Sequence, residues 1–263
     1  MKKVAVLIID AQNDFCSPDG TLFVPGAVED NERLSKWILR NKKSIDYIGC
    51  TLDSHQVVSI AHPSYWVNGD GDHPAPFTTI SLDDMLTGKW RAVKQQRQAL
   101  RYLEALEEND EYSHLVWPEH TLIGDVGSAI DPVVNNAIHS WARQGNQIHF
   151  ITKGTHPDTE HFSVFEAQVP IDDRPETQYN LQLQNMLDKH DVIYIAGQAR
   201  NFCVANSIKH LLNSAPEIGK KIVILDDCTS NIVGYEGVDD EIWNKAESLG
   251  VRLSTTDKEI LLP

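Results

Sequence analysis

The sequence lacks the features that mark several large classes of protein. It has only four cysteines in 263 residues, and no two of them form a CxxC pair. A disulfide scaffold is therefore excluded, and such isolated thiols are typical of reduced, cytosolic proteins. The apolar run from Val4 to Ile9 ends on an acid, and no run approaches the roughly 20 apolar residues that cross a membrane. We therefore expect a cytoplasmic protein without a signal peptide or membrane segment.

Basic residues are also scarce. Lysine and arginine total 23 against 38 aspartates and glutamates, so the formal net charge at pH 7 is −15. A chain of that charge repels phosphate backbones and anionic lipids, so we expect neither nucleic acid nor a membrane surface as a partner. Hydrophobic residues make up 41% and charged residues 23%, as in ordinary globular proteins, which excludes a disordered chain.

Short apolar segments alternate with amphipathic ones along most of the chain. Strands are predicted at Val4–Ile9, Tyr47–Leu52, Ile148–Thr152, Val192–Ala196, Ile222–Leu225 and Val251–Ser254. Helices are predicted at Ala27–Asn41, Asp125–Arg143, Thr177–Lys189, Asn206–Leu212 and Asp239–Leu249. Strands separated by helices indicate βαβ units, and so a doubly wound, mainly parallel sheet between two helix layers. The sequence predicts this three-layer α/β/α fold as a single domain over residues 1–263.

One stretch interrupts the alternation. Residues 66–116 form a long excursion after the second predicted strand, and a helix within it begins at Leu82 or Trp90 and ends at Glu108. Three basic residues are expected to share one face of this helix, namely Lys94, Arg97 and Arg101. The excursion is either a solvated surface insertion, or a lid or subunit contact, because loops beyond about 15 residues are usually functional or disordered.

Polar side chains follow the carboxyl ends of the predicted strands, where parallel sheets place their sites. The segment from Gly197 to Cys203 joins one strand to a helix. A cysteine at a helix start feels the positive end of the helix dipole, which lowers the thiol pKa. Asp10 and Lys153 also follow strands, and could hold such a thiol deprotonated and carry its proton. Cys203 is thus a candidate nucleophile, although free cysteine is also a common buried apolar residue.

A metal site is a second possibility at the same edge. Asp53 and His55 lie two residues apart after the second strand, and His62 and His120 follow later in the chain. One carboxylate with two imidazoles suits Zn²⁺, Fe²⁺ or Mn²⁺. The spacing is not that of a zinc finger, and most of the 11 histidines must be ordinary ones. The spacing alone does not decide whether these residues bind a metal ion.

Several motifs occur in a fixed order along the chain. They are Ile9–Phe15, Leu52–His55, Ser59–His62, Trp117–His120, Thr152–Thr155, Phe162–Ser163, Gly197–Val204 and Asp226–Thr229. In this order the chain resembles the isochorismatase-like cysteine hydrolases, and within that family the nicotinamidases. The motifs cover nearly the whole chain outside residues 66–116.

The resemblance implies a Cys–Asp–Lys triad, which falls on Cys203, Asp10 and Lys153. It also implies a cis peptide bond before the nucleophile, between Gln198 and Ala199. The backbone N–H groups of Ala199 and Cys203 would then form the oxyanion hole.

The resemblance further implies one divalent metal ion, preferably Zn²⁺ with Fe²⁺ or Mn²⁺ as alternatives, held by Asp53, His55 and His120. The family pattern WPxHC supports His120, although Thr121 replaces its cysteine. Nicotinamidases often have a further histidine just before the segment that corresponds to Ser59–Ala61. Here His62 comes just after that segment, so we leave open whether it is a fourth ligand.

The expected substrate-binding residues are Phe15, Trp117, Phe162 and Gln198. The three aromatic side chains either sandwich a flat ring or belong to the core. The implied reaction is the hydrolysis of nicotinamide to nicotinate and ammonia through a thioester, a step of NAD salvage.

Other functions stay open at this stage. The substrate could be another carboxamide, an N-carbamoyl compound or a ureide. A vinyl-ether hydrolase is disfavoured, because those family members lack the cysteine that stands at position 203. A further alternative is a protein that binds a metal or ligand without turnover, and another is a reaction in which the metal alone activates water. The partner is expected to be a small-molecule amide, and a homo-oligomer is left open.

Overall fold

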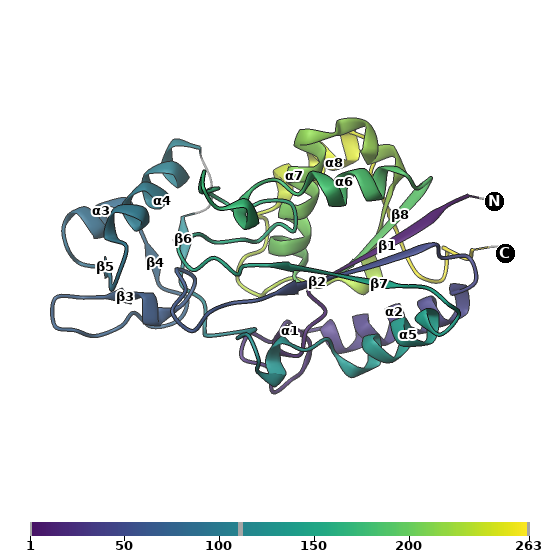
Figure 1. Ribbon diagram of the computed structural model, residues 1–263, viewed down its shortest axis with the longest axis horizontal. Coiled ribbons are helices and arrows are strands. Elements are labelled where there is room, and N and C mark those ends of the chain that lie inside the picture. The colour runs from purple at the N-terminus through teal and green to yellow at the C-terminus, as the bar shows by residue number, and fades with distance from the viewer. Residues whose placement is uncertain (1, 110–112, 262–263) are drawn as a thin grey trace.

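The computed structural model describes residues 2–109 and 113–261. Six parallel strands form the central sheet in the order β10-β9-β8-β1-β2-β7 (Figure 1). Their bounds are Val4–Ile9 for β1, Tyr47–Asp53 for β2, Ile148–Lys153 for β7, Val192–Gly197 for β8, Ile222–Leu225 for β9 and Arg252–Ser254 for β10. The predicted α/β fold is confirmed, and every predicted strand agrees to within one residue at each end.

The strand β1 lies at the centre because its sequence suits a sheet covered on both faces. All six of its residues are buried, and it pairs in parallel with β8 on one side and β2 on the other. The parallel register brings Ile9 beside Gly197, so the residues after β1 and β8 emerge together. On the other side β2 pairs with β7, and Asp53 lies beside Lys153.

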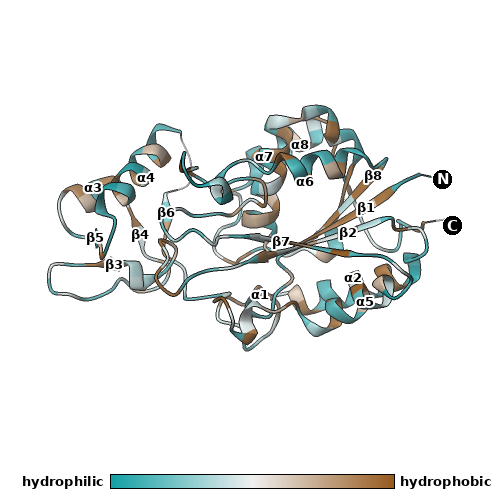
Figure 2. Ribbon diagram, in the orientation of Figure 1, coloured by the Kyte–Doolittle hydropathy of each residue, from teal (hydrophilic) through white to brown (hydrophobic). Residues whose placement is uncertain are grey.

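Helices cover both faces of this sheet. The helices α2 (Ala27–Asn41) and α5 (Pro132–Ala142) lie on one face, and α6 (Leu181–Asp188), α7 (Ala205–Ser214) and α8 (Asp240–Ser248) lie on the other (Figure 1). Each interface has its own apolar core, one centred on side chains such as Leu34 and Trp141, and the other on side chains such as Ile195 and Leu211. Figure 2 shows mainly hydrophobic residues along β1 and β8, whereas hydrophobic and hydrophilic residues alternate along the helices.

Two predicted helices begin later than the periodicity indicates. The segment predicted from Asp125 is first a 3₁₀ turn over Val126–Ser128, and α5 begins only at Pro132. Asp131 caps this helix by accepting the N–H of Val133 at 2.9 Å. The segment predicted from Thr177 likewise begins as a 3₁₀ turn. Its helix α6 starts after Asn180, whose side chain accepts the N–H of Leu183.

The remaining short helical turns lie outside these layers. They are α1 (Asn13–Cys16), a π turn at Arg200–Val204, and 3₁₀ turns at Pro63–Tyr65, Pro216–Lys221 and Asp226–Cys228. Among residues 2–109 and 113–261, no helix combines the length and apolar character that crossing a bilayer requires.

The excursion at residues 66–116 forms a lobe beside the sheet (Figure 1). It holds α3 (Leu82–Leu86), α4 (Gln96–Glu108) and two small antiparallel pairs: β3 (Trp66–Val67) with β5 (Arg91–Ala92), and β4 (Thr79–Ile80) with β6 (His114–Leu115). The lobe buries an apolar cluster of its own, including Trp66, Tyr102 and Leu106. Its assignment as an insertion or lid stays a prediction.

The prediction of one helix from Leu82 or Trp90 to Glu108 is wrong. The strand β5 separates α3 from α4, and Gln95 has a positive φ of 52° just before α4 begins. Lys94 therefore lies outside the helix and does not share a helical face with Arg97 and Arg101. All three side chains are exposed.

Candidate active site

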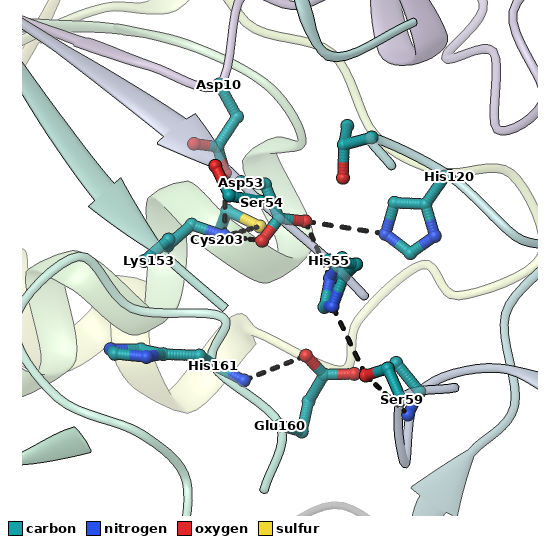
Figure 3. Close-up of polar contacts among 12 residues, drawn as sticks. Asp10, Asp53, Ser54, His55, Ser59, His120, Lys153, Glu160, His161 and Cys203 are labelled. Carbon is teal, nitrogen blue, oxygen red and sulfur yellow. Dashed lines mark hydrogen bonds and ion pairs between the residues drawn. The ribbon is translucent and has the colours of Figure 1, made fainter. Parts of the chain in front are cut away.

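Four predicted site residues meet at the carboxyl edge of the sheet (Figure 3). The Nζ atom of Lys153, at the end of β7, lies 2.9 Å from Asp10 Oδ2 and 3.0 Å from Asp53 Oδ1. The same Nζ lies 3.6 Å from Cys203 Sγ. Lys153 is only 2% exposed and the two aspartates are buried as well. One buried ammonium thus lies between two carboxylates and a thiol.

Asp10 is held in a conformation that few non-glycine residues adopt. Its φ is +43°, in the left-handed region. Thr51 fixes it there, because the Thr51 hydroxyl accepts the N–H of Asp10 at 2.9 Å and donates to Asp10 Oδ1. Burial raises the pKa of the Asp10 carboxyl, although the Lys153 ammonium opposes this. A carboxylate with a raised pKa beside a thiol is a suitable proton acceptor.

The predicted lowering of the Cys203 thiol pKa is wrong. Burial raises the pKa of this thiol well above its usual value. Lys153 opposes this effect, but the nearby Asp10 and Asp53 carboxylates raise the pKa further. Burial and the two negative charges outweigh the effect of the helix start on this thiol. The raised pKa favours the neutral thiol in the resting site, so Cys203 needs a proton acceptor before it can attack.

Two glycines allow these groups to approach so closely. Gly197 has a φ of +116°, and a Cβ at this position would lie 1.9 Å from the carbonyl oxygen of Ile9. Gly154 has a φ of +73°, and its Cβ would lie 2.6 Å from Asp53 Oδ1. Any side chain at either position would separate the strand ends that bear the nucleophile, the base and the lysine.

A buried group able to hold a metal ion adjoins this cluster. Ring nitrogens of His55, His62 and His120 lie within 4.8 Å of one another. Asp53 Oδ2 lies 3.1 Å from Nε2 of His55 and 3.4 Å from Nε2 of His120. Buried imidazoles with one carboxylate are the donors that Zn²⁺ and similar ions prefer, so the residues fit a divalent metal.

The second ring nitrogens show which atoms are available as ligands. Nδ1 of His120 lies 2.8 Å from the carbonyl oxygen of Pro118, and Nδ1 of His55 lies 3.3 Å from the Ser59 hydroxyl. Metal-binding histidines usually donate their second nitrogen in this way, which leaves Nε2 for the ion. Both Nε2 atoms face Asp53, so the predicted set of Asp53, His55 and His120 converges.

His62 approaches from a different side. Its Nε2 lies 3.3 Å from Nδ1 of His120, the nitrogen that faces away from Asp53. Burial, together with His120 and His55, lowers the pKa of His62 to about 2, so its ring is neutral. His62 belongs to the histidine group, but the Asp53-centred set does not require it.

The thiol opens onto a cavity lined by aromatic side chains. The lining residues are Phe15, Leu22, Asp53, Trp117, His120, Glu160, Phe162, Ala199, Phe202, Cys203 and Ile232. The rings of Trp117 and Phe202 stand edge to face with centroids 4.9 Å apart, and Phe162 lies 5.4 Å from Phe202. The predicted aromatic residues therefore share one cavity with the thiol and with two of the candidate metal ligands.

The structure does not bring the Gln198 side chain to this cavity. Gln198 is fully buried, and its amide donates to Asp30 and accepts from the N–H of Ser230. The Gln198–Ala199 peptide bond is cis, as the resemblance implied, and Ala199 lines the cavity beside Cys203.

Sequence reasoning missed several cavity residues. Phe202 lies inside the Gly197–Val204 motif next to Cys203, so its place in the sequence could have marked it as a cavity residue. Glu160 is 3% exposed and accepts the N–H of His161, seven residues after Lys153, and no pattern marked it. Ile232 comes from an irregular loop without any sequence signal.

Comparisons with known proteins agree with this arrangement. No protein-family model matches the chain. The chain is 26% identical over 249 residues to the nicotinamidase of Saccharomyces cerevisiae, covering 92% of this chain and 93% of that protein. A crystal structure of the yeast nicotinamidase bound to the inhibitor nicotinaldehyde superimposes with a TM-score of 0.64, at 22% identity, over 96% of this chain and 99% of that one. The chain has the nicotinamidase fold.

A second solved structure extends the likeness to a metal-bound protein. The pyrazinamidase of Pyrococcus horikoshii in complex with zinc matches 96% of this chain and 99% of its own, with a TM-score of 0.56 and 19% identity. The predicted resemblance to the isochorismatase-like cysteine hydrolases, and to nicotinamidases among them, is thereby confirmed. In this chain Cys203, Asp53 and His120 line one cavity.

Proposed function

We propose that the chain hydrolyses nicotinamide to nicotinate and ammonia through a covalent thioester on Cys203. The observation that supports this most strongly is the contact of one buried lysine with Asp10, Asp53 and Cys203 beside an aromatic cavity. An aromatic cavity suits a flat pyridine ring, and a thiol with an adjacent carboxylate suits acyl transfer. The similarity to the yeast nicotinamidase supports the same substrate.

In the first half of the reaction, Asp10 takes the thiol proton as Sγ of Cys203 attacks the amide carbon. The C–S bond forms, and the negative oxygen is held by the backbone N–H groups of Ala199 and Cys203. Lys153 stays protonated, because the adjacent carboxylates outweigh the effect of burial and raise its pKa. Asp10 then gives its proton to the amide nitrogen as the C–N bond breaks, and ammonia leaves.

In the second half, Asp10 takes a proton from water, whose oxygen attacks the thioester carbon. The second oxyanion collapses, the C–S bond breaks, and Asp10 returns the proton to Cys203 as nicotinic acid leaves and loses its carboxyl proton to solvent, which gives nicotinate. The cycle thus restores the neutral thiol and the Asp10 carboxylate. A single carboxylate serves both halves because it alternates between base and acid.

We further propose that Asp53, His55 and His120 hold one divalent ion, with Zn²⁺ preferred over Fe²⁺ or Mn²⁺. When bound, such an ion would supply a Lewis acid that orients the substrate. Zinc is favoured by the imidazole-rich donor set and by the zinc-bound pyrazinamidase with the same fold. Metal analysis of protein purified without added metal tests this identity.

Another carboxamide, an N-carbamoyl compound or a ureide is the alternative substrate. An ammonia-release assay on the purified protein separates these possibilities, with nicotinamide tested beside aliphatic amides, N-carbamoyl amino acids and ureides at equal concentration. We expect nicotinamide to give the highest kcat/KM. Turnover of only a non-aromatic amide would contradict the proposal.

The partner and the compartment are proposals of the same kind. We propose a small-molecule amide as the partner and the cytoplasm as the location, in keeping with the negative net charge and the reduced cysteines. Assembly with further copies of the chain stays a prediction, which analytical ultracentrifugation would test.

A further inference from the structure

We propose that Asp30 is a positioning residue for the oxyanion-binding turn, because it holds Gln198 and so fixes the N–H of Ala199. This inference rests on the proposed function, since it concerns the same thiol and the same oxyanion. It assigns a role to a buried carboxylate on α2 that belongs neither to the triad nor to the metal group.

Three side chains form a closed hydrogen-bonded ring behind the cavity wall. Asp30 Oδ2 accepts the Gln198 amide at 2.9 Å and the Ser230 hydroxyl at 2.7 Å. Gln198 Oε1 in turn accepts the backbone N–H of Ser230 at 3.1 Å. Every member is therefore both bonded and oriented, and the amide of Gln198 has its nitrogen and oxygen assigned by its partners.

Asp30 and Gln198 in this ring are buried, Ser230 is half-buried, and an arginine outside the ring balances the charge of Asp30. Asp30 is 2% exposed and Gln198 is fully buried. The second oxygen of Asp30 forms an ion pair with Arg33 at 2.7 Å. A buried carboxylate is stable only when paired and hydrogen-bonded, so this network strongly prefers one arrangement.

That arrangement fixes the turn on both sides of Ala199. On one side, the backbone N–H of Gln198 donates to the carbonyl oxygen of Ile9 at 2.8 Å. On the other side, the N–H of Arg200 donates to the carbonyl oxygen of Ser230 at 2.8 Å. The residue between them lines the cavity beside Cys203. An oxyanion donor must be fixed in advance to be effective, and a displacement of about 1 Å can cost roughly 100-fold in rate.

The test is a charge exchange across the ring. Gln198→Glu places a second carboxylate against Asp30 and should push the turn out of position. In the double variant Asp30→Asn/Gln198→Glu, the asparagine amide donates to the new glutamate while its carbonyl accepts Arg33. We expect the single variant to lower kcat by about 100-fold with KM changed less than about 3-fold, and the double variant to recover at least about 10-fold of the loss.

Two readouts separate oxyanion positioning from general damage. Nicotinaldehyde and acetaldehyde add to the Cys203 thiol: Asp10 takes the thiol proton as the C–S bond forms, and the aldehyde oxygen becomes an oxyanion, so their affinity depends on the oxyanion donors. Iodoacetamide alkylates the same thiol without forming an oxyanion. We expect aldehyde affinity to fall and recover in parallel with kcat, and the alkylation rate to stay within about 3-fold of wild type.

Glu259→Gln is the matched control. Glu259 is a half-buried carboxylate that, like Asp30, has an arginine and a hydroxyl partner, but those partners are Arg252 and Tyr194, away from the cavity. The Glu259→Gln variant should have a lower thermal stability than wild type but the same affinity for the aldehydes. If Gln198→Glu does not fold, Gln198→Met removes both amide bonds without adding charge and should lower aldehyde affinity by about 10-fold.

Unchanged aldehyde affinity in folded Gln198 variants would overturn the proposal, as would a folded double variant that recovers nothing. Acetaldehyde requires no recognition of a pyridine ring, so this result is independent of the nicotinamide assay. Absence of ammonia release by the wild-type protein would contradict the proposed substrate but would leave the aldehyde comparison intact.

Discussion

The lobe at residues 66–116 and the carboxyl edge of the sheet both bury histidines, and the two regions use them differently. In the lobe at residues 66–116, His114 lies 2.8 Å from the carbonyl oxygen of Ile60 and 3.3 Å from the Tyr102 hydroxyl, within an apolar cluster. At the sheet edge, His55 and His120 face Asp53 and one another beside a cavity. Burial alone therefore does not indicate a site. Ionisable groups that face each other across a cavity do.

The largest expected effect is at the thiol. Cys203→Ala removes the nucleophile while its small side chain still fits the buried position, so the fold should persist. We expect activity on nicotinamide to fall by at least about 10⁴-fold, as in other enzymes that lose a nucleophile. An ammonia-release assay measures the activity of the variant, and circular dichroism shows whether its fold persists. Activity retained by this variant would contradict covalent catalysis and favour water activation by the metal.

The proton acceptor comes next. Asp10→Asn keeps the shape of the side chain and its contact with Thr51 but can no longer take the thiol proton. General acid–base catalysis typically contributes 10²- to 10⁴-fold, so we expect kcat to fall by about 10³-fold. Stopped assays over a pH series provide the measurement. A loss of less than about 10-fold would mean that another group moves the proton.

The contrast between the two kinds of histidine can be tested directly. His120→Asn should weaken metal binding by at least about 100-fold with little loss of stability, because His120 is proposed as a ligand. His114→Asn should lower stability and leave the metal content unchanged. Titration of the metal-free proteins with Zn²⁺, followed by calorimetry, compares them. Equal metal affinity in the two variants would remove the distinction between the regions.

The lobe should also respond to acid in a defined direction. Burial lowers the pKa of His114 to about 4, below the usual histidine value of about 6.5. Between these values the unfolded chain binds a proton that the folded chain does not, so stability is full above pH 6.5 and falls as the pH drops towards 4. The shift corresponds to about 3 kcal/mol. Urea unfolding of wild type and His114→Gln at pH 7 and pH 4.5 measures this contribution. We expect the free energy of unfolding to fall less between the two pH values in the variant than in wild type. Identical slopes would contradict the assignment.

The smallest effect is expected on the lobe surface. Lys94, Arg97 and Arg101 are exposed, and their simultaneous replacement by glutamine should change stability by less than about 0.5 kcal/mol. We also expect kcat/KM to stay within about 2-fold. A larger change in KM for nicotinamide would show that the lobe contacts substrate, as the lid interpretation of residues 66–116 requires.

The strands of the sheet could be predicted because the residue types within each strand already indicate it, without knowledge of its neighbours in the fold. Segments such as Val4–Ile9 are apolar throughout, which indicates a strand covered on both faces. The helix starts were harder, since 3₁₀ turns such as Val126–Ser128 have the same apolar spacing as the helix that follows. The division of the lobe by β5 depends on a two-residue strand, which is too short to show a period.

Some features of the site could likewise be predicted from the sequence, and others could not. Parallel strand ends meet at one edge, so the proximity of Asp10, Lys153 and Cys203 follows from topology. The orientation of Gln198 does not, because its partner Asp30 lies 168 residues away in the chain. The direction of the Cys203 pKa shift was also missed, since it depends on burial and on charges that only the packed structure brings together.

The central claim is that Cys203 forms a thioester with the acyl group of nicotinamide. The metal-loaded protein would be mixed with nicotinamide, quenched in acid within milliseconds and analysed by peptide mass spectrometry. The account predicts one nicotinoyl group on the peptide that contains Cys203, and none on the corresponding peptide of Asp10→Asn quenched at the same time. Release of ammonia and nicotinate at full rate, with no acyl group on Cys203 at any quench time, would contradict it.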